Sequence, residues 1–425
     1  MMYFAQGSPH TALTSEDLRN GLEAAAEKLG DRNNVLVVPP DITRLHSRAG
    51  ELTRYVVACD KLTVTKIIPA LGTHLPMKSD ELHTMFGDVP QDLFVNHHWR
   101  EDCVKKGTLS PEYIRNVSDG IVDFDVTVGI SRVLFEEPYD AIISISQVVP
   151  HEVAGMAGYT KNLVVGLGGV ENIHKTHFLG AAYGMERIMG RGASPVRRVL
   201  NHAAETFLGD LPIIHVITVL GADEENKQQV RGLFIGDDDE CFERASALSQ
   251  NVNIHTMEKP LDRVVVYLDP VEYKSTWLGN KSIYRTRMAI ADGGELIVLA
   301  PGVKMFGEDP EIDRLIRKYG YHGTRTTLDA VKNNRELQEN LSAAAHLIHG
   351  SSEGRFSITY CTGGLTRDEV ERVGFNYASV DEMITKYKPQ ECAEGVNTLP
   401  CGKDYYFIGA PGGGLWAWEE KFSRQ

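Results

Sequence analysis

The chain has 425 residues, of which 42% are hydrophobic and 24% charged, and its formal net charge at pH 7 is −14. This length exceeds one simple core, so we expect two domains in a globular protein of ordinary composition. The negative charge excludes a nucleic acid held mainly through its phosphates, and no apolar run approaches the roughly 20 residues that span a bilayer.

The cysteines and the first residues bear on where the protein resides. Six cysteines are scattered along the chain and no two have CxxC spacing, which indicates reduced thiols rather than a disulfide framework. The first ten residues lack the basic region and apolar stretch of a signal peptide. We therefore expect a cytoplasmic protein without a membrane segment.

In chain order, the first predicted helix covers residues 14–29 and opens with a capping box at Thr14–Asp17. Three apolar runs typical of buried parallel strands follow, at residues 34–40, 66–71 and 140–146. Each run ends in polar groups: Asp41-Ile-Thr-Arg44, Gly72-Thr-His74 and Val148-Val-Pro-His151. Ligands of open α/β sheets bind at the carboxyl ends of the strands, so we expect these groups on one rim.

The remaining elements alternate in the same way. We predict helices over 178–208, with Pro195 opening the second of them, a strand at 213–217, and a polar surface connection at 221–239. A new unit is expected near residue 260, with strands at 263–268, 295–300 and 356–361 and helices around 283–291, 310–319, 328–349 and after Ser379. Alternation of strands and helices predicts two α/β domains with parallel or mixed sheets. We place them at residues 1–260 and 261–399, with an apolar tail at about 400–425 that packs back on the first domain.

Residues 151–177 hold the densest set of reactive groups, with three histidines, Lys161 and five glycines. Glycines let backbone amides approach an anion, a lysine can meet a phosphate or become a covalent attachment point, and imidazoles bind metals or move protons. No GxxxxGK[ST], GxGxxG or HExxH motif is completed. Composition alone favours a glycine-rich loop that leads into a buried strand, with core or surface histidines.

Three motifs together resemble the lactate racemase family. They are Asp41-x-Thr43-Arg44, Gly72-Thr-His74, and His151-x-x-Ala-Gly155-x-x-Gly158-x-x-Lys161 with His177 sixteen positions later. The resemblance extends in register over about residues 35–180 and more weakly to about 300. It implies two α/β domains with the active site in the cleft between them. It also implies a nickel-pincer nucleotide, the nickel complex of pyridinium-3,5-bisthiocarboxylic acid mononucleotide.

The resemblance also implies roles for individual residues. Lys161 is similar to the lysine joined to the cofactor through a thioamide, and His177 to the protein ligand of nickel. His74 and His151 are similar to the paired acid/base histidines. The remaining positions correspond to cofactor contacts (Asp41, Thr43, Gly155, Gly158) and to a substrate contact (Arg44).

The substrate side departs from the family pattern. Lactate racemases carry Tyr-Gln-x-x-Lys near the substrate, and the matching segment here is Tyr284-Arg285-Thr-Arg-Met288. An expected tryptophan is also missing, since none occurs between Trp277 and Trp416. We interpret Tyr284, Arg285, Lys274 and Trp277 as contacts to a larger hydroxylated acid, such as an aldonic acid, whose carboxylate arginine grips well. A solvated helix face rich in basic residues is an equally good interpretation.

These residues predict an isomerase, a racemase or epimerase that inverts C2 of a 2-hydroxy acid by hydride transfer to and from the cofactor. A histidine on each face would move the hydroxyl proton. Two alternatives stay open: a non-catalytic homologue that binds a nucleotide or metal, and a metal-dependent hydrolase using the histidines. The expected partners are a small acid and the proteins that make the cofactor; the sequence does not determine the oligomeric state.

Overall fold

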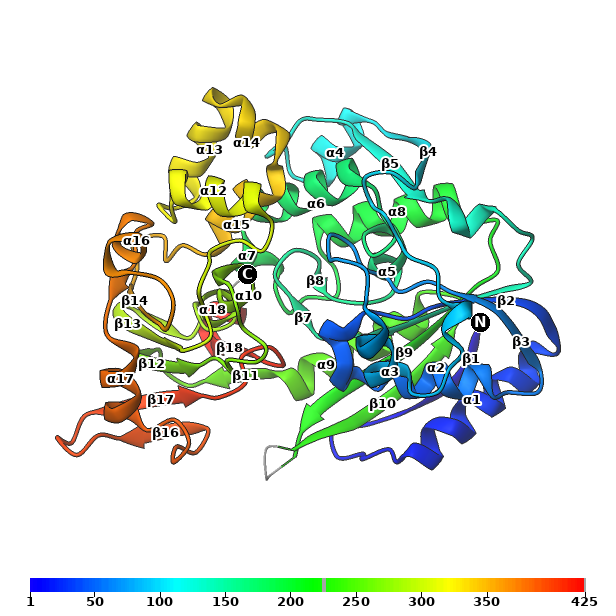
Figure 1. Cartoon of the computed structure of the whole chain (residues 1–425), viewed down its shortest axis with the longest axis horizontal. Helices are drawn as coiled ribbons and strands as arrows, with labels where there is room; N and C mark the ends of the chain where they lie inside the picture. The colour runs from blue at the N-terminus through cyan, green and yellow to red at the C-terminus, as the bar shows by residue number, and fades with distance from the viewer. Residues whose placement is uncertain (224–226, 424–425) are drawn as a thin grey trace. The chain divides into compact units, whose positions relative to one another are not determined.

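The computed structural model describes residues 1–223 and 227–423, and the chain divides into two compact units. Unit 1 comprises Met1–Thr176 and Met189–Asn253, and unit 2 comprises His177–Ile188 and Ile254–Gln425. Each has its own six-stranded sheet with helices packed on it (Figure 1). The protein is therefore α/β with mixed sheets, as the alternation of strands and helices predicts.

The unit 1 sheet has a parallel centre and an antiparallel edge. Its strand order is β1 (Met2–Gly7), β10 (Gln228–Gly236), β9 (Ile213–Ala222), β6 (Ala141–Gln147), β2 (Arg32–Val38) and β3 (Leu62–Ile67). The last four strands are parallel, and β10 and β1 run antiparallel to their neighbours. The carboxyl ends of β2, β3 and β6 therefore meet at one edge, where the sequence places its three polar motifs.

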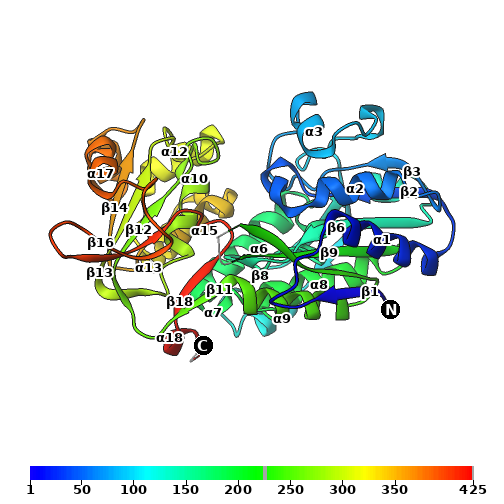
Figure 2. The same cartoon turned by 90° about the horizontal axis from the view of Figure 1, so that it is seen from below.

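Alternation along the strands gives this sheet two apolar faces. Val216 on β9 packs in a cluster with α1 (Ser15–Leu29) and α2 (Ala49–Val57), whereas the next residue, Ile217, packs in a cluster with α9 (Glu240–Asn253). Figure 2 shows α2 and α9 on opposite sides of the sheet. The other elements of this unit surround these layers: η1 (Ile42–Ser47), α3 (Ser79–Phe86), η2 (Gln91–Leu93), α4 (Pro111–Val117), η3 (Arg132–Phe135), α5 (Thr160–Val164), α8 (Pro195–Leu208), and the hairpins β4 (Cys103–Leu109)–β5 (Val126–Ser131) and β7 (Pro150–His151)–β8 (Gly155–Met156).

Unit 2 has a sheet of five parallel strands and one antiparallel edge strand. Its order is β15 (Asn376–Tyr377), β14 (Ser357–Thr362), β13 (Ile290–Ala300), β12 (Leu261–Tyr267), β17 (Asp404–Ile408) and β16 (Gly395–Thr398), the last being antiparallel. The tail also forms β18 (Leu415–Trp418), which pairs in parallel with β11 (Ile254–Met257). The helices of this unit are α7 (Met185–Ile188), α10 (Thr276–Gly279), α11 (Lys281–Tyr284), α12 (Pro310–Tyr319), α13 (Thr324–Asn333), α14 (Arg335–Glu339), α15 (Leu341–His349), α16 (Arg367–Arg372), α17 (Val380–Tyr387) and α18 (Glu419–Ser423).

Local signals in the sequence are confirmed at several helix starts. Thr14 forms the predicted capping box with Asp17, Pro195 opens α8, and Ser379 caps α17 through the amide of Glu382. All six cysteines are free. In the described part of the chain, no helix combines the length and apolarity needed to cross a membrane.

Three sequence-based expectations are wrong. Residues 221–239 are not a surface connection, because β10 lies inside this range and is buried over most of its length; residues 224–226 lie outside the described residues. The second strand ends at Ile67 rather than extending to 71. The helix expected around 283–291 is instead the short α11, followed at Ile290 by the first residue of β13.

Candidate functional site

Asp41 and His74 form a hydrogen-bonded pair at the carboxyl edge of the unit 1 sheet. Asp41 follows β2 and caps η1, and its carboxylate lies 2.6 Å from Nδ1 of His74, which follows β3. Burial alone raises the pKa of Asp41, but hydrogen bonds from His74 and Thr43 outweigh it and hold this pKa below its usual value. The carboxylate is therefore ionised at neutral pH and favours the tautomer of His74 that carries a proton on Nδ1. The Nε2 lone pair of His74 is then available to accept a proton.

The ring of His151 is hydrogen-bonded in the opposite sense to the ring of His74, because its Nδ1 accepts rather than donates. It lies in the β7–β8 hairpin after β6, is 8% exposed, and its Nδ1 accepts hydrogen bonds from the backbone amides of Val153 (3.1 Å) and Ala154 (3.4 Å). A ring that accepts at Nδ1 is neutral and carries its proton on Nε2. His74 and His151 are therefore set as a proton acceptor and a hydrogen-bond donor, respectively.

The amine of Lys161, on α5, has a lowered proton affinity. Burial lowers its pKa to about 8, and the nearby charges of Arg44 and Arg197 act in the same direction, while Glu152 and Asp41 oppose them. About one amine in ten is neutral at pH 7 when the pKa is 8, against about one in three thousand at the usual 10.5. Lys161 thus has the character of a nucleophile or attachment point rather than of a solvated surface lysine.

Three hydrogen bonds connect the segment around Lys161 with the strands and loops of this sheet edge. Asn162, next to Lys161, donates from Nδ2 to the carbonyl of Val38 (3.0 Å) at the end of β2 and to Oγ of Ser144 (3.0 Å) on β6. The amide of Gly72 donates to the carbonyl of Gly166 (2.8 Å) beyond α5. Lys161 is therefore tied to the edge that carries Asp41 and His74, and the shared rim predicted from the three strand ends is present.

Four of the five glycines of residues 151–177 divide into two kinds. Gly155 and Gly158 have positive φ angles of 83° and 75°, which side chains rarely adopt. At Gly166 and Gly168 a Cβ atom would lie 2.2 Å from the carbonyl oxygen of Asn162 and 2.1 Å from that of Val164, so glycine permits a tight end to α5 there. Only the first pair belongs to the loop that leads into Lys161.

His174 and His177 lie one turn apart on α6 (Val170–Tyr183), a helix that begins in unit 1 and continues into unit 2 at His177. The ring of His174 lies 5.9 Å from that of Trp99. Among the described residues, no three His, Cys, Asp or Glu side chains form a ready-made metal site. His97, left out of the predicted site, is 1% exposed and contacts the carbonyl of Gly168 (3.2 Å), a structural role.

The predicted substrate contacts lie in unit 2, each with protein neighbours. Arg285 is 1% exposed, and its Nη1 donates to the carbonyl of Gly414 (3.2 Å). Lys274 is exposed and donates to the carbonyl of Pro270. The rings of Trp277 and Tyr284 pack on two histidines of α15, with centroids 4.5 Å from His346 and 6.3 Å from His349.

Sequence reasoning missed Arg197 on α8 and the two α15 histidines. Arg197 is 2% exposed and donates to the backbone of the loop before Lys161. The sequence does carry a signal for Arg197, because it lies among Val196, Val199 and Leu200 on the apolar side of a helix. A charge placed there needs buried partners. The partners themselves lie about forty positions upstream, and the sequence pattern does not reveal them.

Comparison with known proteins finds a family model that matches the part of the chain carrying this arrangement. Residues 10–187, which include Asp41, His74, His151, Lys161 and His177, match the lactate racemase N-terminal domain. A crystal structure of a protein from Thermotoga maritima is 26% identical, with a TM-score of 0.81 over 96% of this chain and 99% of that chain.

A second solved structure is the lactate racemase apoprotein from Thermoanaerobacterium thermosaccharolyticum. It is 16% identical, with a TM-score of 0.70 over 97% of this chain and 94% of that chain, so its likeness concerns the fold. No curated protein matches the sequence. Residues 10–187 thus match the lactate racemase N-terminal domain with the whole set of motifs inside the match, and nearly all of the chain shares the fold of the lactate racemase apoprotein.

Proposed function

We propose that this protein is a racemase or epimerase that inverts C2 of a 2-hydroxy acid, with a nickel-pincer nucleotide attached to Lys161. The observation that carries the proposal is the half-buried, weakly basic amine of Lys161 on the same sheet edge as the Asp41–His74 pair. A C2 hydrogen is too weakly acidic for a side-chain base alone. An enzyme for this reaction therefore needs a bound group that supplies an electron sink.

The residues present fit such a group. A neutral amine is what thioamide formation requires, and the pKa of about 8 provides it near physiological pH. No set of three protein metal ligands exists among the described residues. A nickel ion would thus draw its sulfur and carbon donors from the nucleotide and one nitrogen from His177. The positive φ angles of Gly155 and Gly158 leave the loop before Lys161 without side chains at two positions, and Asp41 and Thr43 are the further proposed contacts.

The two histidines would handle the hydroxyl proton. His74, oriented by the ionised Asp41, has its Nε2 lone pair ready to accept that proton as C2 is oxidised. His151, with its proton on Nε2, would donate a hydrogen bond to the oxygen on C2. Reduction of the planar keto acid on the face opposite the one that lost the hydride would invert the centre, and reduction on the same face would restore it.

The substrate is proposed to be a larger hydroxylated acid such as an aldonic acid. Support comes from the altered segment Tyr284–Met288 and from the absence of tryptophan between Trp277 and Trp416, since loss of a bulky side chain would open room for a larger acid. Arg44 in unit 1 and Arg285, Lys274, Tyr284 and Trp277 in unit 2 are the proposed contacts. Because Arg285 also donates to Gly414, a bound carboxylate would share it with the chain's tail.

The test begins with covalent attachment. The protein co-produced with the cofactor-making proteins should be heavier by a nucleotide-sized adduct, and Lys161→Ala should remove the adduct. C2-epimer pairs of hydroxy acids are then screened by optical rotation. A substrate deuterated at C2 should yield an epimer that keeps its deuterium, whereas loss of the label to solvent would refute hydride transfer.

The histidine roles need their own variants. His74→Ala and His151→Ala should each abolish turnover with nickel and adduct retained, and full activity in either would refute the two-histidine scheme. Bound nickel with no turnover of any 2-hydroxy acid would indicate a binding protein. Zinc-dependent hydrolysis without an adduct would indicate the hydrolase alternative.

A further inference from the structure

The loop that leads into Lys161 has an unusual backbone. Tyr159, two residues before the lysine, has φ 58° and ψ −134°, a conformation that a bulky side chain rarely adopts. Its amide donates to Oγ of Ser146 (3.2 Å), and its ring stacks on Phe242 with centroids 5.1 Å apart. Strain of this kind persists only where surrounding contacts impose it, so the question is what holds residues 154–160 in place.

One face of α8 supplies those contacts. Ser194, the N-cap of α8, donates from Oγ to the carbonyl of Ala154 (3.1 Å). One turn later, Arg197 donates from Nη2 to the carbonyl of Met156 (2.6 Å) and from Nη1 to the carbonyl of Gly158 (3.2 Å) and to Oγ1 of Thr160 (3.0 Å). One turn further on, Asn201 accepts a hydrogen bond from the same threonine hydroxyl (2.7 Å).

A cavity lies beside the loop and α8. Tyr159 and Thr160 border a cavity of about 420 Å³ that is also lined by Asn201 and His215. The guanidinium of Arg197 is itself fixed from outside the loop, since it lies 4.3 Å from the centre of the Phe242 ring. The hydrogen bonds from α8 thus hold this loop beside the cavity.

Arg197 also acts on Lys161 through its charge. Burial lowers the pKa of Arg197 to about 9, which still leaves it charged at pH 7. The charged groups that act on the Lys161 amine are Arg44 and Arg197, which disfavour its protonation, and Glu152 and Asp41, which favour it. Without Arg197 the balance of these charges moves toward a protonated, unreactive amine.

We infer that Arg197 is a positioning residue for cofactor attachment: it holds the strained 156–160 loop and with it the amine of Lys161 in place. The inference rests on the proposed attachment of the cofactor at Lys161. Joining the amine to a thiocarboxylic acid as a thioamide forms one C–N bond and releases one molecule of water, with no oxidation or reduction. Only a neutral amine can form that bond, so a residue whose charge raises the neutral fraction of the amine affects loading even though it does not touch the substrate.

The test measures the amine of the cofactor-free protein. The wild type, Arg197→Met and Arg197→Lys are labelled with acetic anhydride from pH 6 to pH 11, and the acetylated fraction of Lys161 is read by peptide mass spectrometry. Arg198→Met is the matched control, since Arg198 is the next residue of α8, is exposed, and donates instead to the carbonyl of Val117 (2.8 Å). Adduct occupancy after co-production with the cofactor-making proteins is the second readout, and circular dichroism monitors folding.

Arg197→Met should slow labelling of Lys161 at pH 7 at least about threefold and should lower adduct occupancy. Both the positive charge of the guanidinium and its hydrogen bonds to the loop are lost in this variant. Arg197→Lys should restore the labelling profile but not the occupancy, because it keeps the charge and loses the two-pronged contact. Arg198→Met should match the wild type in both. If Arg197→Met keeps the wild-type labelling profile and occupancy while only its thermal stability falls, Arg197 is merely structural and the inference is wrong.

Three further outcomes keep the result unambiguous. If Arg197→Met does not fold, the test uses Arg197→Lys and Thr160→Val instead. Adduct occupancy equal to that of the wild type in both variants then overturns the inference. If the wild type itself carries no adduct but its labelling profile still depends on Arg197, the proposed cofactor fails while the effect on the amine stands. If the wild type carries the adduct and no variant changes it, the function stands and the inference fails.

Discussion

Replacing Lys161 by methionine should stabilise the cofactor-free protein. The folded protein lowers the pKa of this lysine from 10.5 to about 8. One pH unit corresponds to about 1.4 kcal/mol, so keeping the ammonium charged in its folded surroundings costs about 3 kcal/mol below pH 8. Methionine keeps the apolar stem and removes the charge. We expect about 3 kcal/mol more stability at pH 7, a gain that attachment of a cofactor through the amine would otherwise supply.

The sign of the pH dependence makes this prediction specific. Between pH 8 and 10.5 the unfolded chain binds more protons at this lysine than the folded chain does, so wild-type stability from this group rises with pH. The difference between the variant and the wild type should therefore be full at pH 7 and vanish near pH 10.5. Urea unfolding followed by circular dichroism at both pH values measures it.

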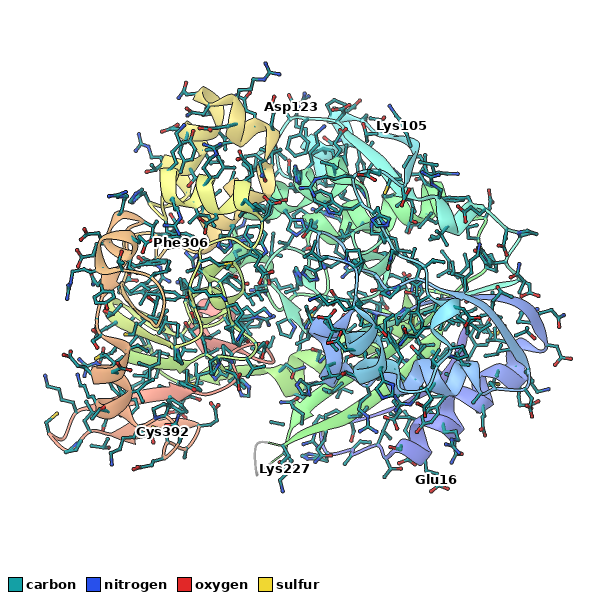
Figure 3. All side chains as sticks on the ribbon, in the orientation of Figure 1. Glu16, Lys105, Asp123, Lys227, Phe306 and Cys392 are labelled. Carbon is teal, nitrogen blue, oxygen red and sulfur yellow. The ribbon has the colours of Figure 1, made fainter. Side chains whose placement is uncertain are left out.

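The matched control is Lys105→Met on β4, whose side chain is exposed at the surface (Figure 3) and should change stability by no more than about 0.5 kcal/mol. A Lys161→Met protein no more stable than the wild type at pH 7 would refute the reasoning.

Three other changes test the site and its supports. Asp41→Asn should lower turnover about 10- to 100-fold with the adduct retained, because a charge-assisted hydrogen bond to His74 worth about 1.5–3 kcal/mol is lost; an unchanged rate would contradict the pairing. His215→Phe should make the folded protein less sensitive to acid. The pKa of buried His215 is lowered to about 3, so the wild type loses about 3 kcal/mol of its free energy of unfolding as pH falls from 7 to 4. Acid titration of both proteins should show the difference. Glu186→Gln should lower the free energy of unfolding in urea by about 3 kcal/mol, because the carboxylate neutralises three cations. It contacts Arg287, Arg355 and Lys421 at 2.9, 3.1 and 2.9 Å, respectively. A loss within about 0.5 kcal/mol would show that these cations tolerate one another.

Several parts of the structure follow from short-range chemistry and are therefore visible in the sequence. The capping box at Thr14 and Asp17, proline at the first turn of α8 and the serine cap of α17 satisfy backbone groups within three residues. The apolar runs that form β2 and β6 are buried on both faces, so their composition alone indicates parallel strands. The motifs that identify the family are likewise short segments read directly from the chain.

The errors occur where distant segments decide the outcome. Strand β10 was interpreted as a connection because its flanks are polar, yet it is buried because β9 and the unpredicted β1 pair with it on both sides. The helical periodicity expected around 283–291 is overridden at Ile290, where β13 begins and pairs with β12.

The sequence by itself determined which amine, which imidazoles and which carboxylate are available, and that three strand ends bring such groups to one edge. What only the tertiary structure decided is their state. The proton on Nδ1 of His74 depends on Asp41, 33 residues away; the acceptor role of Nδ1 in His151 depends on a hairpin; and the weak basicity of Lys161 depends on burial and on Arg197, which α8 brings to it. Protonation is set by the local dielectric, charges and hydrogen-bond partners, and these are properties of the folded chain rather than of any segment of it.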